Sequence, residues 1–390
     1  MADPGSSNER LKDLGRAVLV PVLALLSGLL LGAVVMVFSD PETLRAWASF
    51  GRNPGRAFSE SWELISTAYS ALFRGSLGSR GAISETIVAA TPLILAGLSV
   101  ALAFRAGLFN IGAEGQLLAG TLAAAFVGFT FKSLPMPMLL PFTLLAGASG
   151  GALWGFVPGL LKAKTGAHEV IVTIMMNYVA FRLADYLLKG DVFRRPERND
   201  PVSKGVGENA VLPKIAGDDL RIHAGIILAL LVTYGVWWLL FRSTIGFRFR
   251  TVGSNPKAAA YAGISVGGTF MVSMALAGAL AGLAGTTQLL GIQRNVFPGF
   301  SSGYGFDAIA LALLGRTHPV GVVGAALLFG GLRAGATGMQ AATSTPVDII
   351  VVIQALIITF MAAPLLVREV FRIREKRRAE VETFSKSWAT

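Results

Sequence analysis

The sequence contains no cysteine, only three histidines and few charged residues, with 15% Asp, Glu, Lys and Arg. The lack of cysteine excludes disulfides, thiol catalysis and cysteine-based zinc or iron–sulfur sites. The histidines His168, His223 and His318 are scattered along the chain, so we expect no metal site. So low a charge content in 390 residues is at odds with a soluble domain.

Motifs for ATP hydrolysis are also missing. The chain has no G-x-x-x-x-G-K-[ST] loop to hold a nucleotide phosphate, and it has no H-E-x-x-H zinc motif. We therefore expect that this chain is not an enzyme, has no catalytic residue and binds no cofactor of its own.

Apolar segments make up most of the sequence. Hydrophobic residues account for 53% of it and the mean hydropathy is +0.61, which predicts an all-α polytopic membrane protein. We predict ten transmembrane segments, of which the eighth is too short to cross alone and is expected to be a broken or partial helix. They lie at about 17–38, 83–104, 115–131, 138–161, 168–188, 222–241, 266–290, 304–315, 318–340 and 347–367.

The charge distribution predicts that both termini are cytoplasmic. The net charge of +11 comes mostly from cations at the ends of apolar runs, where membrane orientation and anionic lipids explain them, so nucleic acid is not an expected partner. The 17–38 run lacks an A-x-A cleavage pattern, so we expect a retained first helix after a cytoplasmic N-terminus at 1–16. A basic cytoplasmic tail is expected at 368–390.

Two segments are expected on the outside. Residues 39–82 carry large apolar residues on a partly helical spacing, which predicts an amphipathic helix on the outer membrane surface. Residues 189–221 are the most polar part of the chain and form either a solvated loop or a contact with an external partner. The remaining spans, at 83–367, form the core of the protein.

A basic interruption at 242–265 separates two apolar runs. Its four cations and its lack of Asp or Glu are typical of a cytoplasmic loop. Asn255 suits an N-cap, Pro256 the first helical position and Gly263 the end, so one short helix is predicted here. Two interpretations are open: a coupling helix that receives motion from an ATP-driven partner, or a well-capped connector.

A second polar interruption lies at 104–116. Three glycines, Asn110, Glu114 and Gln116 break an apolar region, so the backbone is expected to bend and the polar groups to need partners inside the protein. We expect Arg105 to pair with Glu114. The segment is either a capped helix hairpin or the lining of a gate in a translocation path.

The fifth apolar run supplies further candidates for a path. His168, Glu169 and Asn177 share one helix face, and a buried amide such as Asn177 either joins helices or contacts solute. Trp154 and Tyr178 either stack on a ring-shaped solute or serve as packing and interface residues.

Two further features concern helix packing. Arg333 lies inside an apolar run and needs a counter-ion, so we predict a structural ion pair with Asp307 or Asp348. The small residues of 278–285 form a G-x-x-x-G pattern, which fits internal helix packing and a subunit interface equally well.

Three segments in order, Pro92–Gln116, Gly166–Tyr178 and Val252–Ile264, closely resemble the permease subunits of bacterial ABC importers for nucleosides and simple sugars. The resemblance runs from about residue 80 to 367, the permease core, and is strongest to the nucleoside branch of this binding-protein-dependent family. It implies an importer in the bacterial plasma (inner) membrane. It also implies three partners: an ATP-binding subunit that holds ATP and Mg²⁺, a second and non-identical permease subunit, and an external solute-binding lipoprotein.

The resemblance also assigns residues. Gly253, Asn255, Pro256, Ala259 and Gly263 match the ATPase-facing loop, and the 110–116 stretch matches a signature segment near the path. Nucleosides are the expected solutes, and monosaccharides such as ribose or galactose are the alternative. A self-sufficient secondary carrier or channel is the alternative of another class, but it would need acidic residues at membrane depth, and these are scarce.

Overall fold

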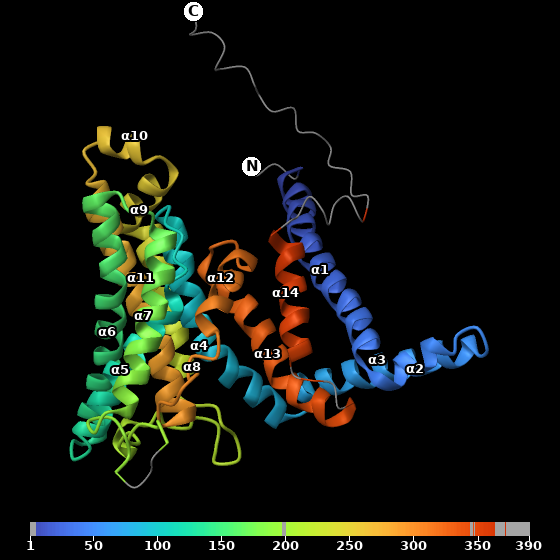
Figure 1. Cartoon of the computed structure of the whole chain (residues 1–390). Helices are drawn as coiled ribbons and strands as arrows, with labels where there is room; N and C mark the ends of the chain where they lie inside the picture. The colour runs from blue at the N-terminus through green and yellow to red at the C-terminus, as the bar shows by residue number, and fades with distance from the viewer. Residues whose placement is uncertain (1–4, 197–199, 344–345, 347, 363–370, 372–390) are drawn as a thin grey trace, which may run out of the picture. The chain divides into compact units, whose positions relative to one another are not determined.

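A computed structural model gives the arrangement of the chain (Figure 1). It describes residues 5–196, 200–343, 346, 348–362 and 371, so the basic tail predicted at 368–390 lies outside the described residues apart from Phe371. The structure is 78% helical with no strand in the part described, which confirms the all-α prediction. The chain divides into two compact units, residues 1–35 with 351–390 and residues 36–350.

The first unit holds most of α1 (Gly5–Ser39) and of α14 (Asp348–Ala362). Gly28 makes their close approach possible, because a Cβ at this position would lie 3.0 Å from the backbone nitrogen of Ile357. Small residues allow the same kind of approach between membrane helices in general.

The second unit is built around α4 (Arg80–Arg105), which is apolar on every side. A helix of this kind is stable only when other helices surround it, and 83% of its apolar stretch is buried. The surrounding helices are α5 (Ala113–Thr130), α6 (Met136–Thr165), α7 (Glu169–Lys189), α8 (Gly225–Arg242), α11 (Val266–Gln288), α12 (Tyr304–Leu314) and α13 (Pro319–Thr343).

Helices α6 and α11 form the closest contact in this unit. A Cβ on Gly278 would lie 2.1 Å from the carbonyl oxygen of Gly151, and one on Gly282 would lie 2.2 Å from that of Gly147. Glycine at these positions lets the two backbones touch. The G-x-x-x-G pattern therefore serves internal helix packing, one of the two alternatives predicted for it.

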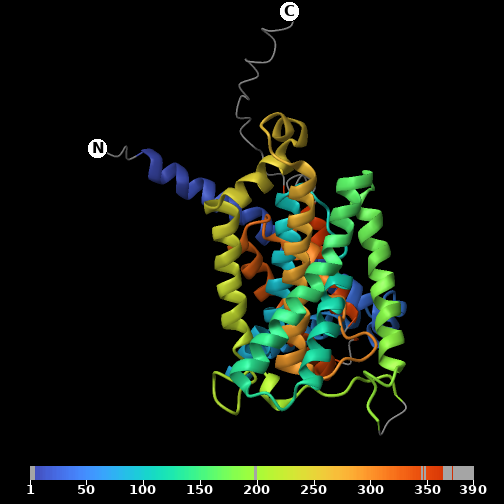
Figure 2. The ribbon, with the colours of Figure 1, turned by 90° about the vertical axis from the view of Figure 1, so that its left-hand side faces the viewer.

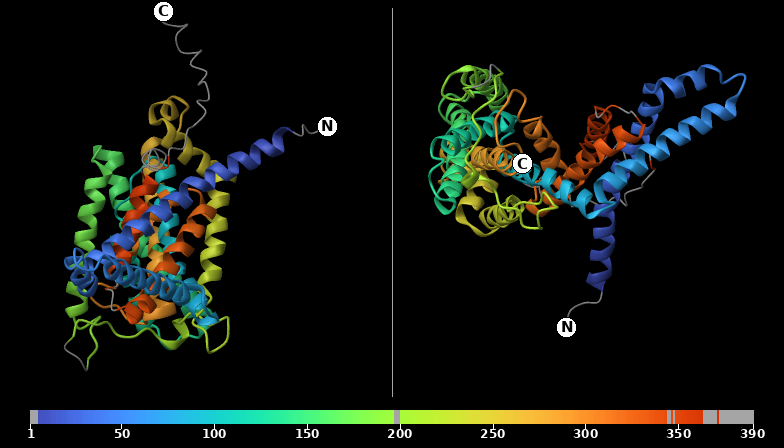
Figure 3. Two further views of the ribbon diagram at one scale, coloured as in Figure 1. Left: turned by 90° about the vertical axis from the view of Figure 1, so that its right-hand side faces the viewer. Right: turned by 90° about the horizontal axis from the view of Figure 1, so that it is seen from below.

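The predicted external helix at 39–82 is instead two helices, α2 (Pro41–Ala48) and α3 (Pro54–Leu77), which fold back on each other (Figure 3). Trp47 of α2 joins them by an edge-on contact with Phe58 of α3, at 5.5 Å between ring centres, and by donating a hydrogen bond of 3.0 Å to Ser61 Oγ. One face of α3 packs on α13, where a Cβ on Gly335 would lie 2.3 Å from the carbonyl oxygen of Leu72. The segment is thus partly a core element.

Seven described helices are long and apolar enough to cross a membrane: those that contain the stretches Val22–Ser39, Arg80–Arg105, Met136–Thr165, Glu169–Lys189, Gly225–Arg242, Val266–Gln293 and Pro319–Thr343. Of the ten predicted spans, α5, α12 and α14 fall short of that standard, since α5 begins with polar residues and α12 has only 11 residues. The expectation of a partial eighth helix agrees with α12. The count of ten stays a prediction.

The polar 190–224 segment is packed against the chain rather than freely solvated. Its backbone bonds to the stretch around the π-helical turn η2 (Leu289–Gln293), with Ser203 N–H to Val296 O at 2.8 Å and Leu212 N–H to Leu290 O at 3.1 Å. A short 3₁₀ turn, η1 (Glu208–Ala210), lies within it. Burial lowers the pKa of His223, at its end, to about 4, and the nearby Arg221 adds to this shift.

Candidate functional site

The basic loop at 242–265 lies at the opposite end of the second unit from the 190–224 segment (Figure 2). It contains two helices rather than the single one predicted: α9 (Thr244–Ser254) and α10 (Pro256–Tyr261). The capping is as predicted, because Asn255 Oδ1 accepts a hydrogen bond of 3.1 Å from Ala258 N–H and Gly263 has φ +78°. Helix α9 also begins with a cap, because Ser243 Oγ accepts a hydrogen bond of 3.1 Å from Gly246 N–H, but the prediction did not include it.

The faces of α10 divide the loop into an inner and an outer surface. Ala259 is fully buried in the chain, so this predicted ATPase-facing residue packs inward instead. Lys257, Ala258 and Ala260 are exposed, and Tyr261 is 94% exposed. A partner that docks on α10 would meet these four residues.

The loop touches the other polar interruption of the sequence. A Cβ on Gly253 would lie 2.3 Å from the carbonyl oxygen of Arg105, and one on Gly107 would lie 2.9 Å from Gly253 Cα. Gly107 also has φ +75°, a conformation that favours glycine. The end of α9 therefore rests directly on the turn between α4 and α5, and the two segments singled out in the sequence are in contact.

Arg105 does not pair with Glu114 as predicted. Its Nε donates a hydrogen bond of 3.1 Å to the carbonyl oxygen of Thr317, and its guanidinium lies 5.6 Å from the centre of the Phe241 ring. Arg250 lies 5.5 Å from the same ring, and His318 packs beside it. Phe241 could not be singled out from the sequence, because Arg105 and His318, two of its partners, lie far away in the chain.

Glu114 is buried at 2% exposure and holds the start of α12. Its carboxylate accepts hydrogen bonds from Gly303 N–H at 3.2 Å and Gly305 N–H at 2.6 Å. These amides belong to the positive end of a helix, which stabilises a carboxylate. The backbones are so close that a Cβ on Gly305 would lie 2.2 Å from Glu114 N.

The same end of α12 is held from α13 by Arg333. Its guanidinium lies 2.5 Å from Asp307 Oδ2, donates to the carbonyl oxygen of Ser302 and lies 4.2 Å from the centre of the Tyr304 ring. Of the two predicted partners, the structure thus brings Asp307 to Arg333, while Asp348 begins α14. The first turn of α12, a helix of 11 residues, is therefore held by Glu114 from α5 and by Arg333 from α13.

The buried amides are bonded within the chain. Asn110 and Gln116 exchange hydrogen bonds between their side-chain amides at 2.9 and 3.1 Å. Asn177 Oδ1 accepts from Gly115 N–H at 2.8 Å, and its Nδ2 donates to the carbonyl oxygen of Ile111 at 3.0 Å. Asn177 therefore joins α7 to the start of α5, as the helix-joining alternative predicted.

The remaining predicted residues lie near the start of α7. Glu169 pairs with Lys162 at 2.5 Å, whereas His168 is largely exposed. Trp154 Nε1 donates a hydrogen bond of 3.3 Å to the carbonyl oxygen of Met176, which fixes the indole between α6 and α7. These contacts favour packing over solute stacking for Trp154.

The chain was also compared with known proteins. A family model described as branched-chain amino acid transport system / permease component matches residues 82–362. The guanosine ABC transporter permease protein NupP of Bacillus subtilis is 40% identical, over 93% of this chain and 98% of its own length. The nucleoside permease NupB of Lactococcus lactis is 36% identical over 90% of this chain and 92% of its own length. The glucose permease TsgB13 of Haloferax volcanii is 35% identical over 87% and 86%. No solved structure matches the chain.

Proposed function

This chain belongs to the branched-chain amino acid transport system / permease component family, and on that basis we propose that it is one permease subunit of an ATP-driven, binding-protein-dependent nucleoside importer. The observation that carries the proposal is the similarity to a guanosine permease along nearly the whole of both chains. Seven helices in the described part of the chain are long and apolar enough to span, so the chain is a multi-pass membrane protein, and we assign it to the bacterial plasma membrane.

Monosaccharides are the second candidate solutes, because a glucose permease is similar over 87% of this chain. Nucleosides are favoured because the two relatives at 40% and 36% identity are both named for them. Both solute classes are uncharged and rich in hydrogen-bonding groups, which suits a path with few fixed charges.

The proposed partners are an ATP-binding subunit, a second permease and an external solute-binding lipoprotein. Bacillus subtilis has two guanosine permease proteins similar to this chain, NupP at 40% and NupQ at 29% identity, which supports a pair of different permeases. ATP and Mg²⁺ would be held in the ATP-binding subunit. Its closure on ATP would change the side to which the path opens.

The proposed route of that motion begins at α10. Asn255, Pro256 and Gly263 shape this helix, and Gly253 at the end of α9 rests on the 105–107 turn. A displacement of α10 would therefore push on the start of α5, where Asn110, Glu114 and Gln116 lie. We assign these three residues to a gate, with Glu114 transmitting movement to α12 through its bonds to Gly303 and Gly305.

The rival from another class is a secondary carrier driven by an ion gradient. Such a carrier needs a carboxylate that is free to bind the ion. Glu114 is bonded to helix amides and Asp307 to Arg333, so both have structural roles in this proposal.

The experiment that tests the function is uptake of labelled guanosine by the assembled complex in liposomes. The chain is purified gently from its native membrane with the subunits that accompany it, and the binding protein is supplied on the outside. We expect uptake that requires ATP and survives the collapse of ion gradients. Uptake by the chain alone, without ATP, would establish the carrier instead.

The coupling role of α10 is tested in the same assay with Tyr261→Ala. Because Tyr261 is a large side chain and is 94% exposed, its loss should reduce uptake roughly tenfold while leaving the chain inserted and stable. Tyr234→Ala on α8, where the ring is 64% exposed, is the matched control and should leave uptake unchanged. Equal uptake by both variants would leave α10 as a connector.

A further inference from the structure

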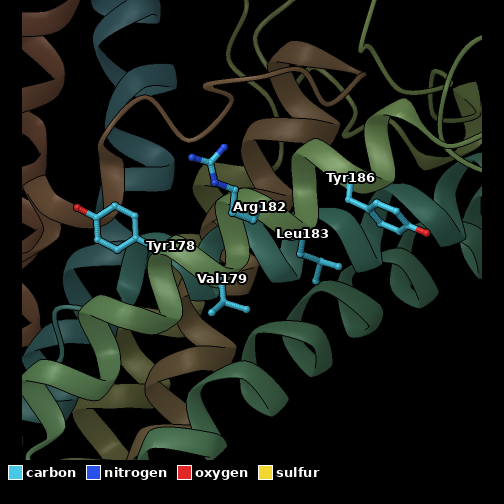
Figure 4. Close-up of a pocket in the computed structure, with 5 residues that line it drawn as sticks. All are labelled: Tyr178, Val179, Arg182, Leu183 and Tyr186. Atoms are coloured by element: carbon cyan, nitrogen blue, oxygen red, sulfur yellow. The ribbon is translucent and has the colours of Figure 1, made fainter.

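One face of α7 is left uncovered by the rest of the second unit. Asn177, Ala180 and Ala184 point inward, while the opposite face is exposed and carries polar groups among its apolar side chains. The exposed residues are Ile171, Met175, Tyr178, Val179, Arg182 and Tyr186. The end of this face, around Tyr178, Arg182 and Tyr186, forms a shallow hollow (Figure 4).

The charge on this face argues against contact with lipid. The Arg182 side chain is 87% exposed and lies seven residues before the end of α7 at Lys189, or about 10 Å along the helix axis. A charged side chain at such a depth in a membrane helix normally faces protein or a watery cavity. Arg182 Nη1 forms an ion pair with Asp185 Oδ2 at 3.7 Å, a separation too long for a hydrogen bond, so the N–H groups of the guanidinium stay available as donors.

The neighbouring aromatic rings fit a flat solute. Arg182 projects from α7 between Tyr178 and Tyr186 (Figure 4). The Tyr178 ring is 60% exposed and is steadied by an edge-on contact with Phe181, at 6.3 Å between ring centres. An exposed ring that is fixed in this way offers a stacking surface to a planar base.

From this geometry we infer that the Tyr178–Arg182–Tyr186 face of α7 binds the base of a 6-oxopurine nucleoside during translocation. This inference rests on the proposed nucleoside import. Tyr178 stacks on the base, and the guanidinium donates two parallel hydrogen bonds to O6 and N7, the pattern by which arginine recognises guanine. Adenine presents an amino donor in place of O6, so the same arginine discriminates against it.

The two parallel hydrogen bonds proposed for Arg182 can be tested by a substitution that changes the base it recognises. Arg182→Gln places a side chain that pairs with the N6 and N7 edge of adenine. We expect the ratio of inosine to adenosine uptake by the complex to fall roughly tenfold in this variant. The external binding protein is the same in both assays, so the change belongs to the permease. An unchanged ratio overturns the inference.

The absence of native cysteine allows a direct test of contact. In the assembled complex, Tyr186→Cys, which keeps Arg182 and replaces a residue that is 76% exposed, should react with a water-soluble thiol reagent, and inosine should slow that reaction several-fold more than adenosine does. The control is Leu231→Cys. Leu231 lies on an apolar part of α8 and is 64% exposed, and its reaction should show no protection by inosine. Reaction without protection overturns the inference. Reaction only in the isolated chain also overturns it, because the second permease would then cover the face.

A failure of the proposed nucleoside import can be distinguished from a failure of the proposed binding face on α7. If the wild-type complex takes up no nucleoside, the proposed function is wrong. If it takes up inosine with ATP while Arg182→Gln keeps the preference for inosine and Tyr186→Cys is not protected, the function stands and the assignment of this face is wrong.

Discussion

Arg333 is the residue on which the position of α12 most depends. It contacts three residues at the start of that helix: Asp307, Tyr304 and the carbonyl of Ser302. Six of the eleven residues of α12 are buried, and these polar contacts hold its first turn in addition to that packing. Glu114 provides the corresponding contact from α5.

We predict that Arg333→Ala destabilises the protein by roughly 2–3 kcal/mol and impairs uptake. Breaking a buried pair leaves one charge without compensation, and the pair here is about three-quarters buried, so the cost should be below that of a fully buried pair. Adding Asp307→Asn should restore part of the loss. Thermal unfolding of the single and double variants measures this coupling.

The matched control is the Arg56–Glu60 pair on α3, where the arginine side chain is 61% exposed. Exposed pairs contribute little because water screens them, so Arg56→Ala should lower the melting temperature much less than Arg333→Ala does. If Arg333→Ala destabilised the protein no more than Arg56→Ala does, or if Asp307→Asn gave no rescue, the role of the Arg333–Asp307 pair in holding α12 would be refuted.

The residue types at these positions could be predicted from the sequence, but the partners only in part. Arg333 in an apolar run demands a counter-ion, and the two candidates named from the sequence include the right one. Arg105 was predicted to pair with Glu114, nine residues away, but it bonds to Thr317 and packs on Phe241. Contacts between distant segments depend on helix packing, which spacing along the chain does not contain.

Helices α6 and α11 approach each other most closely where both carry glycine. Gly147 and Gly151 of α6 face Gly278 and Gly282 of α11 with carbonyl oxygens where side chains would be. Apolar surface gives no preference for protein over lipid inside a bilayer, so close backbone packing has to supply the association energy. The sequence pattern revealed the small residues, but it did not say whether the contact was within the chain or between chains.

We predict that Gly282→Ala destabilises the protein by roughly 1–3 kcal/mol or more, because a Cβ there would lie 2.2 Å from Gly147 O and the helices would have to separate. Gly235→Ala, on α8, is the control: no heavy atom lies within 4 Å of its added Cβ, so it should be neutral or slightly stabilising. Thermal unfolding in detergent compares the two. Equal melting temperatures would contradict the packing role.

Helix α10 could be predicted from its caps, whereas α9 and the two helices of 39–82 were not predicted separately although each also begins with a side-chain cap. The caps of α10 at Asn255 and Gly263 are local chemistry and appear where they were predicted. Helix α9 begins at Thr244, after the N-cap Ser243, but no proline marks its first position as Pro256 does in α10. The 39–82 segment was predicted as one surface helix because its large residues are apolar, while its small buried face, which packs on α13, was overlooked.

In the second unit as a whole, the 190–224 segment and the 242–265 loop lie at opposite ends (Figure 2). The 190–224 segment meets the start of α8, and the α9–α10 pair follows its end. Helix α8 has 18 residues, about 27 Å, which is close to the apolar thickness of a bilayer. If α8 spans, the two segments lie on opposite sides of the membrane.

The cations of 242–265 then place α10 in the cytoplasm and the 190–224 segment outside. We predict that Lys257→Cys reacts with a membrane-impermeant thiol reagent only in inverted vesicles, and that Asp219→Cys reacts only in intact cells or right-side-out vesicles. Both positions are exposed, and the chain has no other cysteine to obscure the result. Reaction of both from one side would mean that α8 does not cross. Reaction from the opposite sides to those predicted would move α10 away from ATP, and the coupling proposal would fail with it.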